Sequence, residues 1–363
     1  MNDLKAENYK DGYYHFRRDT ELYPSSWCYI VFSRRGPGKT YSFLRMMLAD
    51  HIPFVYMKRT KEDVELICNP IDGRDLSPFV PINRDFGTDI KAKQIDKGIG
   101  GFYHTNSEGE CIGKPVGIIL AMNAIKGIKG IDLSDIRYFC FDEFIPQIGE
   151  ITRRGDVEGE MMLSLYMTIA RDRLKRGEED LKLVLFANAE QVSTGVTRVL
   201  DVVDDMCQLV ASGENYVNVR DICIHHITED EIPFTPEELN SPMYRALRGT
   251  VWGRKAFGGE FASQDFTNIC KMPIKKARCM YEVCYRGKYF YIYLQPTTGV
   301  FYACTTKQRS IFSYNLDTEN GQKLFYRERY NQLREACAND KFKFEKYSYY
   351  DLLIVNYKSI FKV

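Results

Sequence analysis

The sequence lacks long apolar runs, and none of its hydrophobic stretches approaches the roughly 20 residues that a membrane-spanning helix needs. Its first 19 residues are polar and charged and contain no apolar core, so they do not predict a signal peptide. The hydrophobic fraction of 44% is that of a globular protein, and 363 residues suffice for two domains of ordinary size. These features predict a protein that does not associate with membranes.

Paired cysteines are also missing. The 11 cysteines are scattered singly, their number is odd, and no two of them form a C-x-x-C pair. This pattern argues against a disulfide framework and against a zinc site, and it predicts reduced thiols in a cytosolic setting. His225 and His226 lie near Cys223, but no second cluster of ligands accompanies them, so we do not expect metal binding there.

Net charge is nearly absent as well, at +1, but the two signs are unevenly distributed. Residues 251–363 contain 19 Lys/Arg and 10 Asp/Glu, a net of +9; of the 50 basic and 49 acidic residues in total, this leaves 31 and 39 for residues 1–250, a net of −8. A basic C-terminal third indicates a polyanionic or acidic partner. A solvated surface of mixed charge is the alternative interpretation.

A strand, a glycine loop and a helix follow one another between Trp27 and Met47. The loop reads SRRGPGKT, which matches the phosphate-binding P-loop pattern G-x-x-x-x-G-K-S/T except that Ser33 replaces its first glycine. Glycines let backbone N–H groups converge on phosphate oxygens, the lysine reaches the β- and γ-phosphates, and the threonine hydroxyl is a ligand for Mg²⁺. A plain glycine turn is the alternative, but it leaves Lys39 and Thr40 unexplained. The expected nucleotide-binding residues of this loop are Ser33, Arg34, Arg35, Gly36, Pro37, Gly38, Lys39 and Thr40.

Downstream of the P-loop, a mostly apolar strand over 136–141 ends in Asp142 and Glu143. This is the Walker B arrangement, in which a buried strand brings carboxylates to the C-terminal edge of a parallel sheet, where ligands bind. We expect Asp142 to hold Mg²⁺ and Glu143 to orient and deprotonate the attacking water. The alternative is a strand that ends at an exposed acidic turn.

Two further segments carry candidate residues for phosphate recognition. A helix is expected over 160–176, and its terminal arginines either complement the helix dipole or include an arginine finger that reaches the γ-phosphate of a neighbouring subunit. The apolar strand 181–186 precedes Asn188, which suits a γ-phosphate sensor; a turn-forming asparagine is the alternative. Apolar strands with helices between them predict a doubly wound parallel core.

The composition changes after this expected core. Residues 229–238 are acidic and interrupted by prolines, as expected of a small linker. Aromatic strands then follow at 279–284, 289–294 and 299–304. Their aromatic residues are expected to form a core rather than to stack on bases. We therefore predict an α/β P-loop ATPase domain over 1–212, a linker subdomain over 213–252 and a β-rich domain over 253–363.

The succession of RGPGKT, FVYMKRT, YFCFDEF, IARDR and LVLFANA resembles the genome-packaging ATPases of phi-29-like small podoviruses, which are related to the large terminases of tailed phages. The resemblance implies an ASCE-type, RecA-like P-loop fold that uses ATP and Mg²⁺. It implies a homomeric ring, usually of five subunits, that docks on the procapsid portal and drives double-stranded DNA inward. It further implies contact with a structural packaging RNA, a location in the host cytoplasm, and absence from the mature virion.

The resemblance also assigns roles to particular residues. Arg171 matches the arginine finger that acts in trans. Lys126 and Lys129 fall where the family has a pore-facing loop that grips DNA, and Lys61 matches another basic position.

The C-terminal domain is similar to an RNase H-like nuclease domain that has lost its cleavage function. Active terminase nucleases hold two metal ions with clustered carboxylates. The acidic residues available here are too dispersed for such a site to be assembled from the sequence; they are Asp265, Glu282, Asp317, Asp340 and Asp351. The alternatives are a terminase-like packaging protein with an active metal-dependent nuclease and a nucleotide-regulated scaffold that binds nucleic acid.

Overall fold

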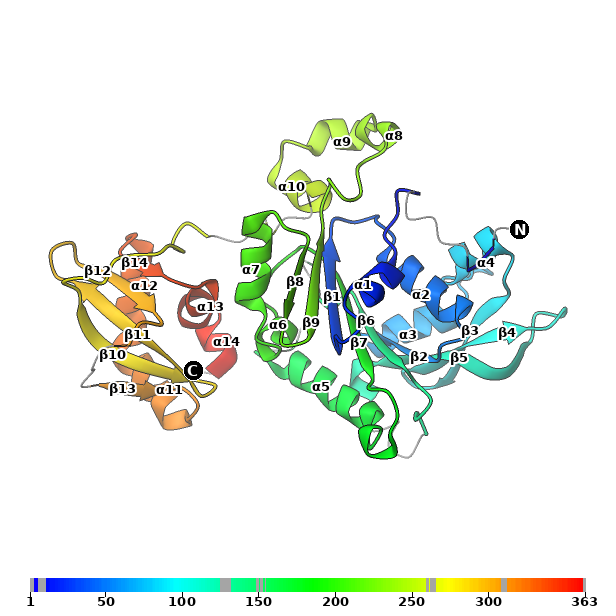
Figure 1. The fold of residues 1–363 in the computed structure, drawn as a ribbon, viewed down its shortest axis with the longest axis horizontal. Coiled ribbons are helices and arrows are strands. Elements are labelled where there is room, and N and C mark those ends of the chain that lie inside the picture. The colour runs from blue at the N-terminus through cyan, green and yellow to red at the C-terminus, as the bar shows by residue number, and fades with distance from the viewer. Residues whose placement is uncertain are drawn as a thin grey trace. The chain divides into compact units, whose positions relative to one another are not determined.

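The computed structural model divides into two compact units (Figure 1). It describes residues 3–5, 11–124, 132–147, 150, 153, 155–258, 261, 266–307 and 312–361. The first unit comprises Met1–Ile151, Glu160–Gln191 and Gln208–Ser263, and the second comprises Thr152–Gly159, Val192–Cys207 and Gln264–Val363. Within the described ranges, no helix has both the length and the apolar character needed to cross a membrane.

A sheet of nine described strands forms the centre of the first unit, in the order β3-β4-β5-β2-β6-β7-β1-β9-β8. The strands are β1 (Cys28–Ser33), β2 (Phe54–Lys58), β3 (Ile90–Asp96), β4 (Ile99–Thr105), β5 (Cys111–Ala121), β6 (Tyr138–Asp142), β7 (Lys182–Asn188), β8 (Tyr216–Val219) and β9 (Ile222–Ile227). The strands from β5 to β9 in this order run parallel, whereas β3, β4 and β8 pair in antiparallel fashion at the two edges. All of β1 is buried, as expected for a parallel strand covered on both faces. The predicted mixed α/β fold with a parallel core is confirmed.

Helices pack on this sheet and bury its apolar faces. Phe16, Phe43 and Phe186 come from α1, α2 and β7, and their ring centroids lie 5.6–5.9 Å apart in edge-on contacts. The helices that lie wholly or partly in the first unit are α1 (Phe16–Leu22), α2 (Lys39–Ala49), α3 (Lys61–Cys68), α4 (Val80–Phe86), α5 (Val157–Ala170), α7 (Val203–Ser212), α8 (Pro236–Leu239), α9 (Pro242–Leu247) and α10 (Val251–Gly258), with short 3₁₀ turns at Met122–Ala124 and Leu174–Arg176.

The helix predicted over 160–176 ends earlier than expected. α5 stops at Ala170, because Asp172 adopts a left-handed backbone with φ of 58° that an α-helix cannot accommodate. A separate 3₁₀ turn then covers Leu174–Arg176. The arginines of this region therefore lie on a turn rather than on a helix.

The sheet also extends further along the chain than predicted. β8 and β9 belong to it, so the range 213–252 predicted as a linker begins inside the sheet. The helical part of that range is α8, α9 and the start of α10. Phe234, Tyr244 and Phe257 hold these short helices together, with ring centroids 4.9–6.3 Å apart.

A buried ion network connects α1 to the end of the sheet. His225 Nδ1 lies 3.0 Å from Asp19 Oδ2, and its Nε2 lies 2.8 Å from Glu231 Oε2. Tyr14 and Tyr216 donate hydroxyl hydrogen bonds of 2.7 and 2.9 Å to Asp19. Burial alone would lower the pKa of His225, but Asp19 and then Glu231 raise it to about 9. Both ring nitrogens of His225 therefore contact carboxylates.

A five-stranded sheet in the order β13-β10-β11-β12-β14 organises the described part of the second unit. Its strands are β10 (Arg278–Tyr285), β11 (Lys288–Gln295), β12 (Val300–Cys304), β13 (Ser313–Asn315) and β14 (Phe342–Phe344). β10, β11 and β12 form an antiparallel meander, β13 runs parallel to β10, and β14 runs parallel to β12. The helical segments are α6 (Gly195–Val199), α11 (Glu319–Phe325), η3 (Tyr326–Tyr330), α12 (Asn331–Ala338), α13 (Tyr347–Tyr350), η4 (Asp351–Val355) and α14 (Tyr357–Phe361).

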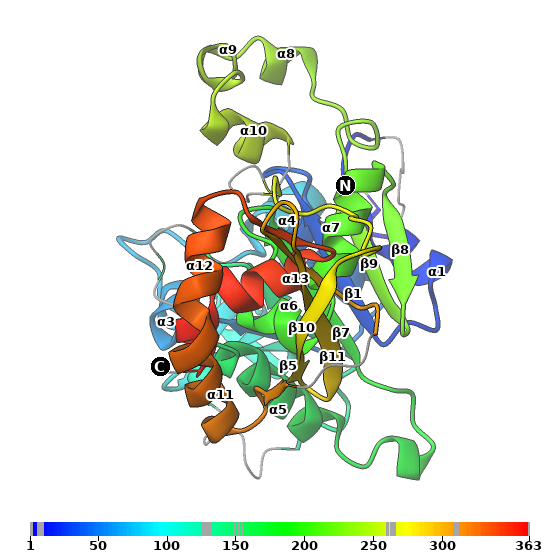
Figure 2. The ribbon, with the colours of Figure 1, turned by 90° about the vertical axis from the view of Figure 1, so that its left-hand side faces the viewer.

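Aromatic side chains fill the core of the second unit. Tyr281 and Phe290 from the sheet pack in one buried cluster with Phe325 of α11 and Leu333 of α12. Figure 2 shows these two helices alongside the strands. The prediction that the aromatic strands form a core is confirmed.

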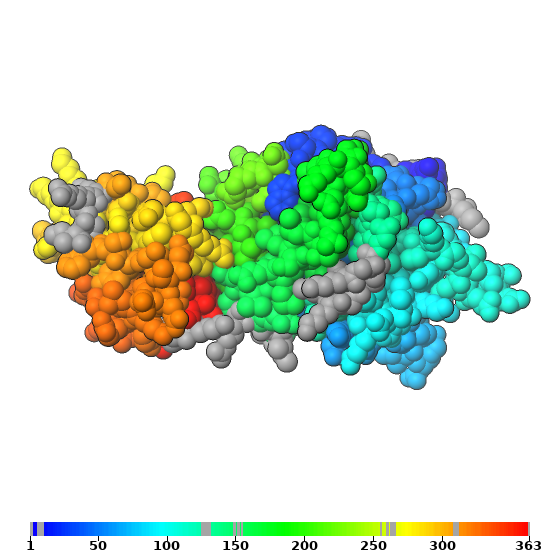
Figure 3. Space-filling view, turned by 90° about the horizontal axis from the view of Figure 1, so that it is seen from below, coloured from blue at the N-terminus to red at the C-terminus, as the bar shows by residue number. Residues whose placement is uncertain are grey.

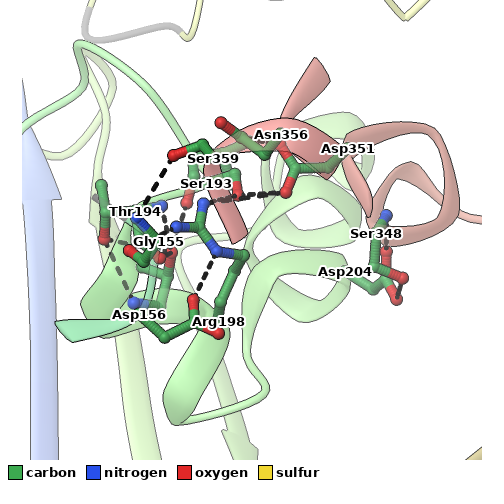
Figure 4. A network of polar contacts seen from close by, with 12 residues as sticks. Gly155, Asp156, Ser193, Thr194, Arg198, Asp204, Ser348, Asp351, Asn356 and Ser359 are labelled. Atoms are coloured by element: carbon green, nitrogen blue, oxygen red, sulfur yellow. Dashed lines mark hydrogen bonds and ion pairs between the residues drawn. The ribbon is translucent and has the colours of Figure 1, made fainter. Parts of the chain in front are cut away.

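Polar contacts bind separate stretches of the second unit together (Figure 4). Arg198 of α6 donates from Nε to Asp156, from Nη1 to Ser193 and from Nη2 to the Gly155 carbonyl, at 2.8–2.9 Å. Ser193 in turn donates a 2.7 Å hydrogen bond to Asp351, a carboxylate that is 2% exposed and whose pKa is raised by burial. Three segments far apart in the sequence are joined in this way.

Candidate nucleotide-binding site

The P-loop predicted from the sequence connects β1 to α2. Gly36 and Gly38 have φ of 100° and 90°, a left-handed backbone that favours glycine over other residues. α2 begins at Lys39, so its first backbone N–H groups and the positive end of its dipole lie next to the loop. Both glycines and the first residues of α2 line a cavity of about 420 Å³, which we call the phosphate cavity.

Lys39 is buried inside the loop. Its Nζ donates to Ser33 Oγ at 2.5 Å, to the Arg34 carbonyl at 3.3 Å and to Asn188 Oδ1 at 3.5 Å. Burial lowers the pKa of Lys39 to about 8, against the opposing charge of Asp142. The contact with Ser33 gives a physical reason for a serine at the first glycine position of the motif. A phosphate in the cavity would offer this ammonium a charged, stronger acceptor.

Oxygen ligands suited to Mg²⁺ meet beside the loop. Thr40 Oγ1 lies 3.1 Å from both carboxylate oxygens of Asp142, and Tyr56 of β2 donates a 2.5 Å hydrogen bond to the same carboxylate. Hydroxyl and carboxylate oxygens are the donors that Mg²⁺ prefers, and this ion usually completes its shell with water and substrate phosphates. Thr40 and Asp142 therefore fit Mg²⁺, although the described residues contain no group of three or more His, Cys, Asp or Glu that could hold a metal ion.

Glu143 lies at the same edge of the sheet, directly after β6. Its backbone is left-handed, with φ of 58°, and Lys58 Nζ lies 3.1 Å from its carboxylate. Arg59 Nη2 donates to the Glu143 carbonyl at 2.9 Å. Burial alone would lower the pKa of Lys58, but the charges of Asp142 and Glu143 outweigh it and raise that pKa. Lys58 therefore pairs with the Glu143 carboxylate, and Arg59 holds the Glu143 backbone.

Sequence reasoning missed the roles of Tyr56, Lys58 and Arg59 at this site. The sequence signal that could have identified them is the polar end of the second strand, FVYMKR. The C-terminal ends of neighbouring parallel strands lie at one edge of the sheet, so polar residues at the end of this strand are candidates for the same site. That β2 neighbours β6 is visible only in the folded sheet.

A second cavity of about 660 Å³ shares Gly38, Tyr41 and Pro81 with the lining of the phosphate cavity. Its walls come from residues 11–15, from α2 and from α4. The Arg45 guanidinium lies 4.8 Å from the centroid of the Phe86 ring in this wall. A cavity of this size with an aromatic wall suits a flat group such as a nucleobase.

The two arginines of the P-loop differ in their surroundings. Arg35 lines the phosphate cavity. Arg34 is nearly buried by the linker segment: its Nη2 donates to the Ile232 carbonyl at 3.2 Å, its guanidinium carbon lies 3.7 Å from the centroid of Phe234, and its Nη1 lies 3.9 Å from Glu238. The side chain of Arg34 is thus committed to the linker, which leaves its backbone as the group available to a nucleotide.

The remaining predicted residues lie apart from the phosphate cavity. Arg171 is exposed on the turn after α5, and it is not among the described residues that line that cavity. The green part of the chain, to which α5 belongs, reaches the surface in the view of Figure 3. Lys61 begins α3 and is partly buried. Lys126 and Lys129 lie outside the described residues.

No protein-family model matches the sequence, and no curated protein matches it. Two solved structures resemble the fold over nearly its full length. The phi-28 gp11 DNA packaging motor shares 16% identity, with 98% of this chain and 99% of that chain covered and a TM-score of 0.60. The bacteriophage phi-29 viral genome packaging motor assembly shares 18% identity, with 94% and 97% covered and a TM-score of 0.62. This chain therefore has the fold of the subunits of phage DNA packaging motors.

Proposed function

We propose that this chain is an ATP-hydrolysing subunit of a viral DNA-packaging motor. The observation that carries the proposal is the meeting of Lys39, Thr40, Asp142, Glu143 and Asn188 around one cavity at one edge of a parallel sheet. β7 lies between β1 and β6, the strand arrangement that supports an ASCE-type, RecA-like P-loop domain. The full-length similarity in fold to two packaging motors supports the use of this chemistry for DNA packaging.

Each residue around the phosphate cavity has its own role in the proposed hydrolysis of ATP. The loop N–H groups and Lys39, which leaves its contacts with Ser33 and the Arg34 carbonyl, bind the β- and γ-phosphates. Thr40 and Asp142 hold Mg²⁺, which neutralises phosphate charge when it is bound. Glu143 accepts the proton of the attacking water.

A neighbouring subunit completes the site. Arg171 is exposed and lies apart from the phosphate cavity of its own chain, which supports its action in trans on the γ-phosphate of the next subunit. Such a site requires a neighbouring copy of the chain, and a homomeric ring of five subunits is proposed from the family resemblance. The ring would dock on the procapsid portal from the host cytoplasm and be absent from the mature virion.

Nucleic acid is the proposed cargo. Lys126, Lys129 and Lys61 are the proposed contacts to double-stranded DNA, and phosphate contacts without base contacts suffice for translocation. The net charge of +9 over residues 251–363 supports a polyanionic partner for the C-terminal region, such as a structural packaging RNA.

The proposed C-terminal domain is RNase H-like and does not cleave DNA. Three of the carboxylates considered for a nuclease have structural contacts, and one of these is Asp340, which pairs with Lys343. Asp317 accepts a 3.0 Å hydrogen bond from the Gly287 backbone N–H, and Asp351 accepts hydrogen bonds from Ser193 and Asn356. Asp265 lies outside the described residues.

Steady-state ATPase assays on mixed subunits test the proposal. Glu143→Gln and Arg171→Ala should each be nearly inactive alone, and mixing them should restore activity, because an intact Glu143 then meets an intact Arg171 of a neighbour. Double-stranded DNA should raise the wild-type rate. Full activity of Arg171→Ala alone would refute the trans finger, and a wild-type rate that ignores DNA would refute the motor.

A further inference from the structure

Arg173, the second arginine of the Arg171-Asp-Arg173 sequence, is one of the most deeply buried large side chains in the protein. It is 1% exposed, whereas Arg171 is exposed. Its Nη2 donates a 3.2 Å hydrogen bond to the Leu133 carbonyl, and Glu178 lies 4.0 Å from its Nη1. In the described part of the chain, its Nε and Nη1 have no hydrogen-bond partner.

Stability does not explain this burial. A buried cation without a full set of partners is destabilising, and an apolar side chain of similar volume is usually better tolerated. A second arginine makes the charged form of Arg173 still less favourable. Burial lowers the pKa of Arg173, and the charge of Arg137 lowers it further. The guanidinium therefore has a different use at this position.

The turn after α5 is built around this residue. The Arg173 carbonyl accepts backbone hydrogen bonds from Arg176 at 2.9 Å and from Glu178 at 3.1 Å. The Arg176 side chain lies 2.8 Å from the Glu178 carboxylate, and Gly177 closes the turn in a left-handed conformation with φ of 72°. The Arg173 side chain is the part of the turn that reaches the segment before β6, through Leu133.

We propose that Arg173 is a positioning residue that fixes the turn carrying Arg171, so that the finger is presented to the neighbouring subunit in one orientation. The inference rests on the proposed function, since it needs a finger that acts in trans. Without the bond to Leu133, the turn loses its anchor and Arg171 samples several orientations. Because a misplacement of about 1 Å can reduce a rate about 100-fold, finger donation should fail while the variant's own ATP site stays intact.

The test uses Arg173→Lys, which keeps the charge but not the planar fork that reaches Leu133. Mixed with Glu143→Gln, this variant receives an intact finger and should regain activity. Mixed with Arg171→Ala, it must donate the finger, and activity should be at least tenfold lower than in the reference mixture of Glu143→Gln with Arg171→Ala. Lys175→Gln is the matched control, because Lys175 lies in the same turn with its side chain 84% exposed, and it should donate normally.

Arg173→Met serves as a second variant that removes the charge and should show the same asymmetry. Equal restoration in both mixtures, or equal failure in both, would overturn the inference, because a general folding or assembly defect harms both roles alike. Failure of the reference mixture would overturn the proposed function itself, and the inference with it. Thermal melting shows whether each variant is folded. If Arg173→Met is unfolded, the result with Arg173→Lys decides whether the inference holds.

Discussion

Replacing His225 by glutamine should destabilise the protein in a manner that depends on pH. The wild-type pKa is about 9 in the folded protein, against an ordinary value of 6.5. The folded state therefore binds the proton more tightly, and the difference corresponds to about 3 kcal/mol of stability. This contribution is fully present below pH 6.5 and is lost as the pH rises through about 9. His225→Gln should thus lose about 3 kcal/mol at pH 6 and much less at pH 9.5.

Urea unfolding of wild type and variant at pH 6, 7.5 and 9.5 measures this difference. Comparison at each pH cancels the titration of other groups, such as Lys39, whose pKa is lowered to about 8 and which therefore acts in the opposite direction. Tyr216→Phe is a useful control, since it removes a hydrogen bond from an uncharged hydroxyl to the Asp19 carboxylate and should cost about 1.5–3 kcal/mol at every pH. A destabilisation by His225→Gln that is the same at all three pH values would refute the assignment of a charged His225 between Asp19 and Glu231.

Three further substitutions probe the site and the second unit. Tyr56→Phe removes the hydrogen bond that orients Asp142, and it should raise the Mg²⁺ concentration for half-maximal ATPase activity roughly tenfold; an unchanged Mg²⁺ dependence would contradict this role. Arg34→Met removes the contacts to the linker segment, and amide hydrogen exchange in α8–α10 should become roughly tenfold faster while β1 stays protected. Arg198→Met leaves Asp351 buried without its cation, and it should destabilise the second unit by about 3–5 kcal/mol, seen as earlier thermal unfolding and faster proteolysis.

The elements that were predictable from the sequence are those whose signal is local. A few adjacent residues suffice to recognise the apolar strand before Ser33, the glycines after it and the strand before Asp142. The structure places these segments in β1, the loop and β6. Their meeting at one edge followed from a general property of parallel sheets. The aromatic strands of the second unit were recognisable for the same reason.

What could not be predicted depends on contacts between distant segments. Lys58 faces Glu143 only because β2 lies next to β6, and no local pattern encodes that order. The helical pattern after residue 160 continues past Ala170, but the buried side chain of Arg173 and the left-handed Asp172 turn the chain aside. That β8 and β9, within the range predicted as a linker, join the main sheet was not predictable, because they are short strands whose pairing is set by the folded sheet.

Arg34 belongs to two sets of contacts at once. Its carbonyl accepts a hydrogen bond from Lys39, and its guanidinium lies on Phe234 and bonds to the Ile232 carbonyl of the linker segment. A nucleotide that draws Lys39 toward its phosphates would therefore remove one contact of the residue that holds the linker. Coupling between two sites is reciprocal. If nucleotide binding weakens the contacts of Arg34 with the linker, then loss of those contacts would change the free energy of nucleotide binding by the same amount. Force on the linker segment and nucleotide binding at the loop would then be coupled, and the rate of nucleotide exchange would depend on that force.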